Sequence, residues 1–397
     1  MSTSALSGLK VVEFAHVIAG PLAGALLADL GAEVVHVEDP GRGDPQRNAG
    51  PHRDGTHLWW KVSARNKRSV TLDLRSDDGR AVALELAAWA DVVITNFRVS
   101  TLEKWGLDYA SLHAANPRLV LLQVTGFGAK SSRRNHPGFG KVGEAMSGVV
   151  NITGFEDGPP VHTGFSHGDS VTGLMGAFAV QAALYRRDND PDFDGEWIDL
   201  ALYESLYRLI EWQVIFYDQL GEVPQRAGNR LAAAPAAVIN TFRTSDGHWI
   251  TVTSGTPRSV TNVAALVGEP VEDYATSAQQ AERRDRLDRL VAQWISQRAL
   301  DECLEVMSAL EVVASPIYTV PEILEDPTFA ENGNVVTLED PDLGEVRMQG
   351  VVPRMTNHPG AVRRTAPALG EDNERVYGDY LGKDSVELER LRRAGAI

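Results

Sequence analysis

Short β-rich apolar runs alternate with stretches of helical periodicity over the first 125 residues. The β-rich runs lie at 9–14, 33–38, 69–74, 91–96 and 119–125. Helical spacing of apolar residues follows the first run at 22–30 and recurs at 77–89 and 102–112. A repeated strand–helix–strand order favours parallel pairing through helical crossovers. The sequence therefore predicts an α/β fold, with a Rossmann-like parallel sheet and helices on both of its faces.

The remaining chain predicts a second, smaller α+β domain. A strand at 197–202 leads into a predicted helix at 203–220. Residues 238–254 form two alternating runs around Ser-Asp-Gly, which is typical of a β-hairpin. Further elements are predicted as helices at 257–267, 281–298 and 300–309 and as a hairpin pairing 335–339 with 345–349. We predict a large Rossmann-like α/β domain over 1–225, a small α+β domain over 226–330 and a C-terminal segment over 331–397 that returns to the large domain.

The charge balance, cysteine content and hydropathy of the chain limit the partners and the location that we expect. The 397 residues carry 38 Lys and Arg against 54 Asp and Glu, a net charge of −16. This balance argues against nucleic acid, whose phosphates need a basic surface. Cys303 is the single cysteine, so no intrachain disulfide can form. We found no signal-peptide core and no apolar run of the roughly 20 residues that span a bilayer, and we expect a cytoplasmic protein with no membrane partner.

A nicotinamide dehydrogenase is the first alternative that a Rossmann-like fold raises. The first strand–helix turn reads AHVIAGPLAG at 15–24 and lacks the G-x-G-x-x-G fingerprint. Pro21 stands where that fingerprint needs a free amide. Glu38 ends the second strand as a ribose-binding acid does, but a lone acid is weak support. The glycine pattern therefore disfavours NAD binding.

One carboxylate stands out at 154–187, where a turn-rich segment runs into a helix of small residues. Glycines at 154, 158, 164 and 168 precede Asp169, and apolar residues then recur at helical spacing. Asp is a preferred N-cap, and a helix N-terminus stabilises an anion. The residues alone leave two interpretations open, a helix cap or a reactive carboxylate at the mouth of a helix.

Several motifs resemble, in the same order along the chain, those of family III CoA-transferases. The Gly-Pro-Pro turn followed by Gly168-Asp169 resembles the family's nucleophile signature. The other matching segments are VVEFAHVIAGPLAG at 11–24, GAEVVHVEDPGRGD at 31–44, NKRSVTLDL at 66–74, ADVVITNF at 90–97 and PGFGKVGEAMSG at 137–148. The resemblance spans nearly the whole chain. It implies an interlocked, ring-like homodimer that takes acyl-CoA and a carboxylic acid as substrates and holds no permanent cofactor.

The resemblance also implies roles for individual residues. Asp169 would be the nucleophile, and Lys141 or Glu144 would help to position the reaction. The residues expected near CoA are His16, Val17, Ile18, Ala19, Arg42, Lys67, Arg68, Asn96, Phe97, Arg98, Lys104 and Lys141. Taken alone, the basic segment at 65–68 is equally a solvated turn, and Phe97 is equally a core residue or an adenine-stacking one. We expect the acceptor to be a small di- or hydroxy-carboxylate, with His16, His167 and Arg230 as candidates for its carboxylates.

The resemblance implies a mechanism in which the donor thioester becomes an anhydride with Asp169 and then an aspartyl-CoA thioester. This nucleophilic route splits one exchange into easier steps and needs neither ATP nor metal. We see no H-E-x-x-H, no paired cysteines and no P-loop, so we expect no metal site.

Three alternatives remain open. An α-methylacyl-CoA racemase shares the fold but needs two acid/base groups, and this chain has Phe139 and Gly140 at the places of the racemase His-Asp pair. A serine hydrolase would use Ser166 in GFSHG at 164–168, although the preceding residues make a poor strand. A non-catalytic acyl-CoA-binding protein would use Asp169 only as a cap.

Overall fold

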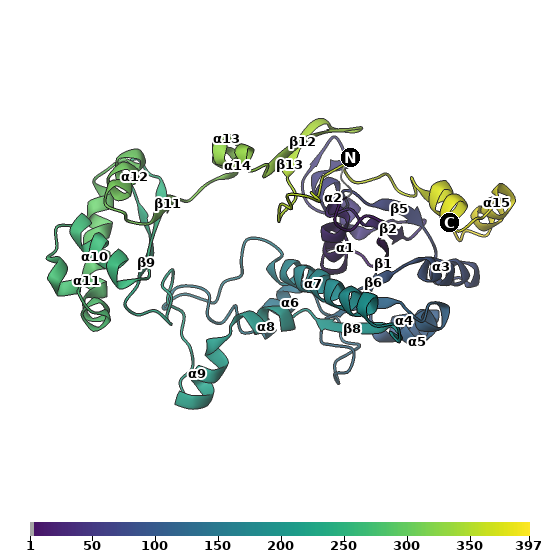
Figure 1. Cartoon of the computed structure of the whole chain (residues 1–397), viewed down its shortest axis with the longest axis horizontal. Coiled ribbons are helices and arrows are strands. Elements are labelled where there is room, and N and C mark those ends of the chain that lie inside the picture. Colours follow the sequence, from purple (N-terminus) through teal and green to yellow (C-terminus); the bar gives the residue numbers. More distant parts are fainter. Residues whose placement is uncertain (1–3) are drawn as a thin grey trace. The chain divides into compact units, whose positions relative to one another are not determined.

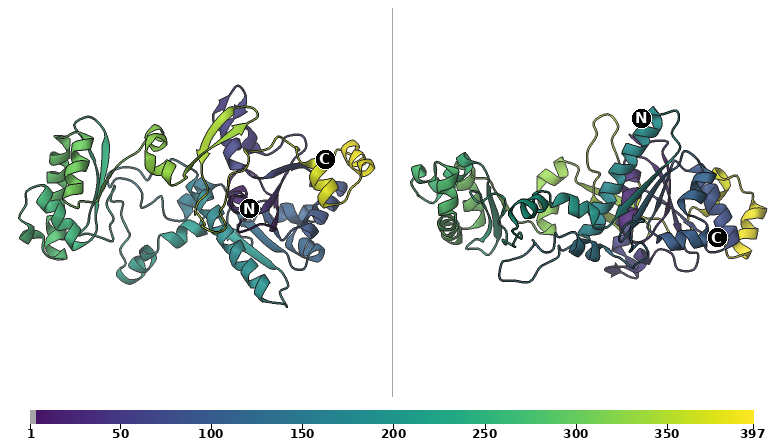
Figure 2. Two further views of the ribbon diagram at one scale, coloured as in Figure 1. Left: turned by 45° about the horizontal axis from the view of Figure 1, so that its top comes forward. Right: turned by 90° about the horizontal axis from the view of Figure 1, so that it is seen from below.

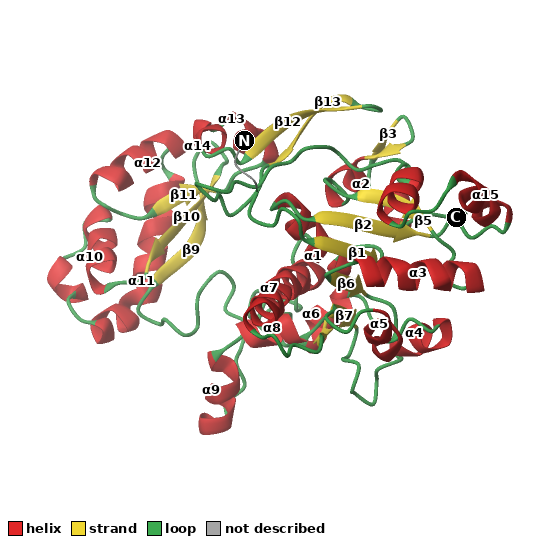
Figure 3. Cartoon of the chain, turned by 45° about the vertical axis from the view of Figure 1, so that its right-hand side comes forward, coloured by secondary structure: helices red, strands yellow, loops and turns green. Residues whose placement is uncertain are grey.

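A six-stranded parallel sheet forms the centre of the larger part of this chain. The computed structural model describes residues 4–397. The strands are β1 (Lys10–Phe14), β2 (Glu33–Glu38), β5 (Arg68–Thr71), β6 (Val92–Thr95), β7 (Val120–Thr125) and β8 (Glu196–Ala201) (Figure 3). Their order is β5-β2-β1-β6-β7-β8, and every pairing is parallel. In chain order of these strands this is the 3-2-1-4-5-6 arrangement of Rossmann folds. The predicted fold class is confirmed.

Helices cover both faces of the sheet, as predicted. Helices α1 (Ala19–Asp29) and α7 (His167–Asn189) pack on one face, and α3 (Asp77–Trp89), α4 (Val99–Trp105) and α5 (Tyr109–Ala115) pack on the other (Figures 1 and 2). Neighbouring strand residues divide between the two cores, since successive side chains of a strand point to opposite faces. Val11 belongs to the core under α1 and α7, whereas Val12 belongs to the core under α3.

Small residues let α7 lie close to its neighbours. A β-carbon on Gly173 would lie 2.9 Å from the Ala19 carbonyl oxygen of α1, and one on Gly176 would lie 2.8 Å from Leu122 of β7. The small-residue pattern of this segment therefore reflects close packing onto the sheet. Although α7 has 23 residues, neither it nor any other helix within residues 4–397 is long and apolar enough to cross a membrane.

Two predicted helices are each broken into two. The stretch predicted at 102–112 is interrupted by Gly106, which ends α4 with a left-handed φ of 65°. Asp108 then caps α5 by accepting a hydrogen bond from the Ser111 amide. The stretch predicted at 203–220 contains α8 (Glu204–Leu209) and α9 (Trp212–Leu220), separated at Glu211, whose φ is 29°. Periodicity alone did not reveal these breaks because the apolar spacing continues across both.

The C-terminal residues pack on the same unit as the sheet. The Tyr377 hydroxyl donates to the Thr71 carbonyl at 2.8 Å, and Arg390 pairs with Asp78 of α3 at 2.9 Å. The remaining elements of this unit are η1 (Pro45–Asn48), β3 (His52–Arg53), β4 (Thr56–His57), α2 (Leu58–Ser63), α6 (Gly140–Met146), α14 (Pro327–Glu331), β12 (Val335–Asp340), β13 (Gly344–Gln349), η3 (Arg375–Tyr380) and α15 (Ser385–Arg393). The hairpin of β12 and β13 matches the predicted one.

A second compact unit comprises Val150–His162 and Trp212–Asp326. Its antiparallel sheet pairs β9 (Val238–Arg243), β10 (Trp249–Ser254) and β11 (Ala314–Pro316), so the predicted hairpin at 238–254 is present. Its other elements are α9, α10 (Pro257–Leu266), η2 (Val271–Tyr274), α11 (Ser277–Ser296), α12 (Leu300–Ala309) and α13 (Val320–Glu325). A separate apolar core, which includes the buried Cys303, holds this unit together. The functional domain boundaries at 225/226 and 330/331 stay predictions.

Candidate active site

The two central strands, β1 and β6, bring two predicted site residues together. Their crossover helices leave on opposite faces, which opens a crevice at their carboxyl ends where ligands of open α/β sheets bind. His16 follows β1 and Asn96 follows β6. The His16 amide donates to Asn96 Oδ1 at 3.0 Å, and Asn96 Nδ2 donates to the His16 carbonyl at 2.7 Å. This reciprocal pair fixes the segment after β1 at the edge of the crevice.

Asp169 opens into a small cavity at this crevice, with a volume of about 100 Å³. The cavity is lined by His16, Val17, Ile18, Ala19, Asn96, Val124, Thr125, Gly126, Gly138, Phe139, Asp169 and Leu202. Six residues predicted from separate motifs thus meet around one space: the carboxylate, the four residues after β1 and the amide after β6. Sequence reasoning placed them near the same ligand by resemblance, and the fold brings them into one wall.

A neighbouring groove of about 250 Å³ shares His16 with the Asp169 cavity. It contains two further predicted residues, Arg42 and Phe97. The Phe97 ring lies 5.0 Å from the His16 ring and 4.9 Å from the Trp105 ring. Arg75, which the sequence analysis did not single out, also lines the groove. Aromatic and guanidinium groups side by side suit a nucleotide, whose base stacks and whose phosphates pair with cations.

Other predicted CoA contacts lie elsewhere. The Lys67 ammonium is fully buried and pairs with Glu13 at 2.8 Å, and it also donates to the Pro21 carbonyl at 2.6 Å. Arg68 pairs with Asp372 at 2.9 Å and with Glu33. Neither side chain lines the Asp169 cavity or the groove. Their basic character, which suggested phosphate binding, is used inside this chain.

Arg98, Lys104 and Arg230 take three different positions. Arg98 and Lys104 are exposed, and each precedes or follows by one residue an aromatic side chain of the groove. Their contact with phosphates stays a prediction. Arg230 belongs to the second unit and pairs with Asp288 at 2.7 Å and Asp285 at 2.8 Å.

Asp169 is not the N-cap of α7, so the first of the two interpretations that the sequence left open, a helix cap, is wrong. The helix begins at His167, with Ser166 in the N-cap place but making no side-chain cap. Asp169 therefore sits in the first turn. Capping comes instead from α6, because Glu144 Oε1 accepts a hydrogen bond from the Gly168 amide at 3.0 Å. This long-range cap leaves the Asp169 carboxylate available to the cavity.

Lys141 and Glu144 of α6 fix the loop that leads to Asp169. Glu144 is almost fully buried and pairs with the Lys141 ammonium at 3.0 Å. The same ammonium donates to the Thr163 and Phe165 carbonyls, each at 3.1 Å. Lys141 therefore holds the loop at Thr163 and Phe165, and Glu144 holds it at the Gly168 amide. Charge-assisted hydrogen bonds of this kind are stronger than neutral ones.

The environment of Asp169 disfavours its charge. Burial, with a smaller contribution from the Glu144 carboxylate, raises the pKa of Asp169 to about 6, and Lys141 opposes the shift. The sequence predicts that the helix N-terminus stabilises this anion and so lowers its pKa. Desolvation has the opposite effect and is larger. With such a pKa the carboxylate is still mostly ionised near pH 7, and its negative charge is less stabilised than that of an exposed carboxylate.

The family is decided by the whole-chain match. A family profile described as CoA-transferase family III matches residues 6–373. The chain belongs to this family.

Curated relatives of this CoA-transferase cover nearly its whole length. A succinyl-CoA–D-citramalate CoA-transferase of Chloroflexus aurantiacus is 40% identical over 99% of this chain and 98% of the relative. The β subunit of a succinyl-CoA–L-malate CoA-transferase from the same organism is 36% identical over 100% of this chain and 99% of the relative. A solved CaiB/BaiF family protein from Brucella suis superposes with a TM-score of 0.83 at 33% identity, covering 96% of this chain and 100% of that one.

The residues of this CoA-transferase do not support a hydrolase or dehydrogenase. Ser166 is preceded by irregular chain and not by a strand, so the strand–turn–helix context of a nucleophile elbow is missing here. Glu38 is buried and held by Arg47, with contacts of 2.6 Å and 2.7 Å. That acid is therefore not available to a ribose. Phe139, at the place of a racemase base, is 73% exposed and carries no acid/base group.

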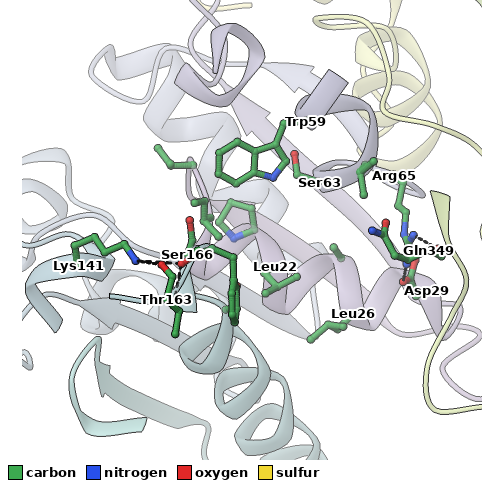
Figure 4. Close-up of a pocket in the computed structure, with 18 residues that line it drawn as sticks. Leu22, Leu26, Asp29, Trp59, Ser63, Arg65, Lys141, Thr163, Ser166 and Gln349 are labelled. Carbon is green, nitrogen blue, oxygen red and sulfur yellow. Dashed lines mark hydrogen bonds and ion pairs between the residues drawn. The ribbon is translucent and has the colours of Figure 1, made fainter. Parts of the chain in front are cut away.

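A larger pocket of about 740 Å³ shares Val17 and Ile18 with the Asp169 cavity. Figure 4 shows Lys141, Thr163 and Ser166 at one end, Asp29, Arg65 and Gln349 at the other, and Leu22 and Leu26 between them. Trp59 and Ser63 of α2 face the α1 side chains. The pocket thus offers an ammonium and hydroxyls near the Asp169 loop and an apolar floor.

Proposed function

We propose that this CoA-transferase moves CoA from succinyl-CoA to a small hydroxy-dicarboxylate of about the size of malate or citramalate, with Asp169 as the acyl carrier. The observation that carries the proposal is the partly buried Asp169 carboxylate, which shares its cavity with the predicted CoA-binding loop His16–Ala19. The printed names of the two curated relatives supply the substrate class. The exchange forms a new thioester as the old one breaks, so the free energy of the thioester bond is conserved and no ATP is needed.

The proposed chemistry proceeds in paired steps. The Asp169 carboxylate attacks the thioester carbonyl carbon, the C–S bond breaks, and CoA leaves as a thiolate. A mixed anhydride between the donor acyl group and Asp169 remains. The thiolate then attacks the aspartyl carbonyl carbon, releasing the donor as a free carboxylate and leaving an aspartyl-CoA thioester. The acceptor carboxylate attacks that thioester, and the same two steps run in reverse. At the end, the acceptor leaves as its CoA thioester and the Asp169 carboxylate is regenerated.

Several features of the cavity support such intermediates. A space of about 100 Å³ admits the reacting atoms and little water, which would hydrolyse an anhydride. Backbone amides of the glycine-rich segments supply donors for the tetrahedral oxyanions. His16 stays neutral at this wall, because burial lowers its pKa, although Asp44 opposes the shift. A neutral imidazole leaves the thiolate free to attack.

We assign the far end of the dicarboxylates to the larger pocket. The Lys141 ammonium lies beside Ser166 and already donates to Glu144 and to the Thr163 and Phe165 carbonyls. It therefore contributes positive charge, and the Ser166 hydroxyl supplies the hydrogen bond to a distal carboxylate. Ser63 and Ser170 line the same pocket and suit the hydroxyl of a hydroxy acid. The apolar floor of α1 fits the carbon chain between the two carboxylates. The CoA nucleotide then occupies the groove of Arg42, Arg75 and Phe97.

We also propose that the enzyme is the homodimer expected from its family resemblance. On α7, Leu174, Phe178 and Tyr185 are 60%, 69% and 74% exposed. Their spacing places them on one side of the helix. An apolar stripe of this size on an enzyme helix favours burial against a second copy of the chain.

The proposal is tested by offering a panel of acyl-CoA donors to free carboxylic acids and identifying the products by mass spectrometry. Succinyl-CoA with malate or citramalate is expected to give the new thioester without ATP or added metal. Incubation with donor, followed by hydroxylamine or borohydride trapping, is expected to modify Asp169. Asp169→Ala should lose transfer and the modification together.

Two results would contradict the assignment. Full activity of Asp169→Ala would remove the nucleophile, and binding of acyl-CoA without any turnover would favour a non-catalytic binding protein. Asp169→Asn is a weaker probe because the amide can deamidate back to the acid. Ser259→Ala removes a half-buried capping-box hydroxyl of α10 in the second unit and provides a control for handling and folding.

A further inference from the structure

Val17 holds a backbone conformation that β-branched residues rarely adopt. Its φ is 67°, in the left-handed region. Such a conformation persists only where surrounding contacts impose it, and it is often found at functional sites. Val17 lines the Asp169 cavity, the larger pocket and the turn into α1. The backbone conformation of Val17 therefore affects the shape of both the Asp169 cavity and the larger pocket.

A buried carboxylate imposes that conformation. Both oxygens of Asp44 accept a hydrogen bond from the Val17 amide, each at 3.1 Å. The preceding amide, that of His16, is held by Asn96. Two side chains from different loops thus fix two successive peptide groups. The Asp44 carboxylate is 1% exposed, so its charge needs a buried partner.

His36 is that partner. Its Nε2 lies 3.2 Å from Asp44 Oδ2, and its Nδ1 lies 2.6 Å from Glu13 Oε2. Only an imidazolium can donate from both ring nitrogens to two carboxylates. Glu13 also accepts from the Lys67 ammonium at 2.8 Å. Two carboxylates are thereby balanced by two cations, all of them buried.

The charge state agrees with this geometry. Although burial favours the neutral ring, hydrogen bonds to Asp44 and Glu13, with the charge of Glu38, raise the pKa of His36 to about 9. None of these groups touches the reacting atoms in the mechanism above. They form a chain from Lys67 through Glu13, His36 and Asp44 to the Val17 amide.

We propose that His36 and Asp44 are positioning residues of the transfer reaction: the imidazolium bridges Glu13 and Asp44, and Asp44 holds Val17 in the left-handed conformation that shapes the wall facing Asp169. The inference rests on the proposed function of Asp169 as acyl carrier. His36 and Asp44 of the 31–44 motif and Lys67 of the 66–74 motif therefore act through the backbone of the first loop and not on phosphates.

The test is a double-mutant cycle between His36 and Val17. His36→Gln leaves Asp44 without a cationic partner, and kcat is expected to fall by about tenfold to a hundredfold because the reacting groups are misplaced. The KM for succinyl-CoA should change less, since Arg42, Phe97 and Asp44 of the nucleotide groove all keep their side chains in this variant. Glycine adopts a positive φ without a side-chain penalty. In a Val17→Gly background, the same His36→Gln change is therefore expected to lower kcat much less.

A matched control separates positioning from stability. Lys61 is buried in the same unit and pairs with Asp340 at 3.0 Å. Lys61→Gln breaks a comparable buried pair, and it is expected to lower the unfolding midpoint while kcat stays at the wild-type value. Should His36→Gln fail to fold, Asp44→Asn replaces it in the same cycle, because it keeps the shape of the side chain and one acceptor oxygen.

Two outcomes would overturn the inference. One is an unchanged kcat in His36→Gln, and the other is an equal loss with and without Val17→Gly. A wild-type enzyme that transfers CoA to none of the acids would defeat the proposed function instead. In that case a crystal structure of His36→Gln still decides the point, since a Val17 φ near the wild-type 67° would contradict the positioning role.

Discussion

Gly140 leaves the space that the Asp169 carboxylate occupies. A β-carbon on Gly140 would lie 2.1 Å from Asp169 Oδ2 and 2.6 Å from its carboxyl carbon. Gly140 is the first residue of α6, and the same helix provides Lys141 and Glu144 around the Asp169 loop. The absence of a side chain at Gly140 thus makes room for the Asp169 carboxylate.

Gly140→Ala is expected to displace the Asp169 carboxylate from the cavity. The contact falls on the end of a side chain that can rotate, so folding should survive while the reacting oxygen moves. A displacement of about 1 Å at a reacting atom costs about a hundredfold in rate. Steady-state CoA transfer and the yield of trapped aspartyl adduct measure the loss.

Gly255→Ala is the matched control for that substitution. A β-carbon on Gly255 meets nothing within 4 Å, and this residue lies between β10 and α10 in the second unit. Its kcat should equal that of the wild type. Wild-type activity in Gly140→Ala would mean that Asp169 reacts from a different side-chain position.

The activity should rise with pH through the pKa of Asp169. A carboxyl pKa raised to about 6 keeps part of the nucleophile protonated in mildly acidic solution, so kcat/KM should fall as pH drops below about 6. Glu144→Gln removes a neighbouring negative charge and is expected to shift this limb to lower pH. Lys141→Met removes the opposing positive charge and should shift it to higher pH. Shifts of the same sign in both variants would show that the limb belongs to another group.

Ser166→Ala separates the transferase from a serine hydrolase. The Ser166 side chain makes no cap on α7, so its loss should cost little stability. The transferase should keep much of its kcat, with an effect confined to the acceptor KM through the larger pocket. A hydrolase would lose all activity. Assaying thioester transfer and hydrolysis in the same samples distinguishes the two.

Buried His36 should make the protein less stable in alkaline solution. Its folded pKa of about 9 lies above the ordinary value of 6.5, so the stabilisation is fully present below pH 6.5 and is lost as pH rises through about 9. The groups that face the ring are Glu13 and Asp44, with Glu38 and Lys67 beyond them. The urea midpoint of the wild type is expected to fall over that range.

His36→Gln provides the comparison for the alkaline loss. The variant should be less stable at neutral pH, and its urea midpoint should change less between pH 6.5 and about 9. Titration of exposed groups contributes equally to both proteins and cancels in the difference. Parallel curves for the two proteins would show that His36 does not titrate in this range.

Sequence reasoning identified the sheet because each strand carries its own apolar signal. It placed Asp169 at a helix start because glycines and then small residues surround it. It could not find Glu144 as the cap of α7, since the contact with the Gly168 amide joins residues 24 positions apart. Local capping rules therefore assigned the N-cap to Asp169 itself.

The acidic partner of Lys67 in the 66–74 motif could not be predicted from charge. Lys67 is fully buried against Glu13, a contact across 54 positions that no local pattern encodes. When its acidic partner is unknown, a lysine at the start of a strand can be interpreted as a phosphate ligand. Similarly, Gly106 broke a helix whose apolar spacing continued on both sides. Pairings that depend on the folded chain could not be predicted, whereas periodicity and resemblance were sufficient to predict the fold and to single out Asp169.

The apolar stripe of α7 gives the last prediction, on oligomeric state. Leu174 and Phe178 lie one helical turn apart and are 60% and 69% exposed. Native mass spectrometry and light scattering of the wild type are expected to give twice the chain mass. Phe178→Asp places a charge where a second copy would cover it, and should lower the dimer fraction together with activity.

Val386→Asp controls for adding a charge at an exposed apolar site, because Val386 of α15 is 76% exposed and isolated from the stripe in sequence. This variant should keep the wild-type mass and kcat. A wild-type monomer with full transfer activity would contradict the dimer proposal and leave the Asp169 chemistry standing. A dimer that survives Phe178→Asp unchanged would place the interface on another surface, since an interface that buries this ring cannot accept an unpaired carboxylate without a large loss of affinity.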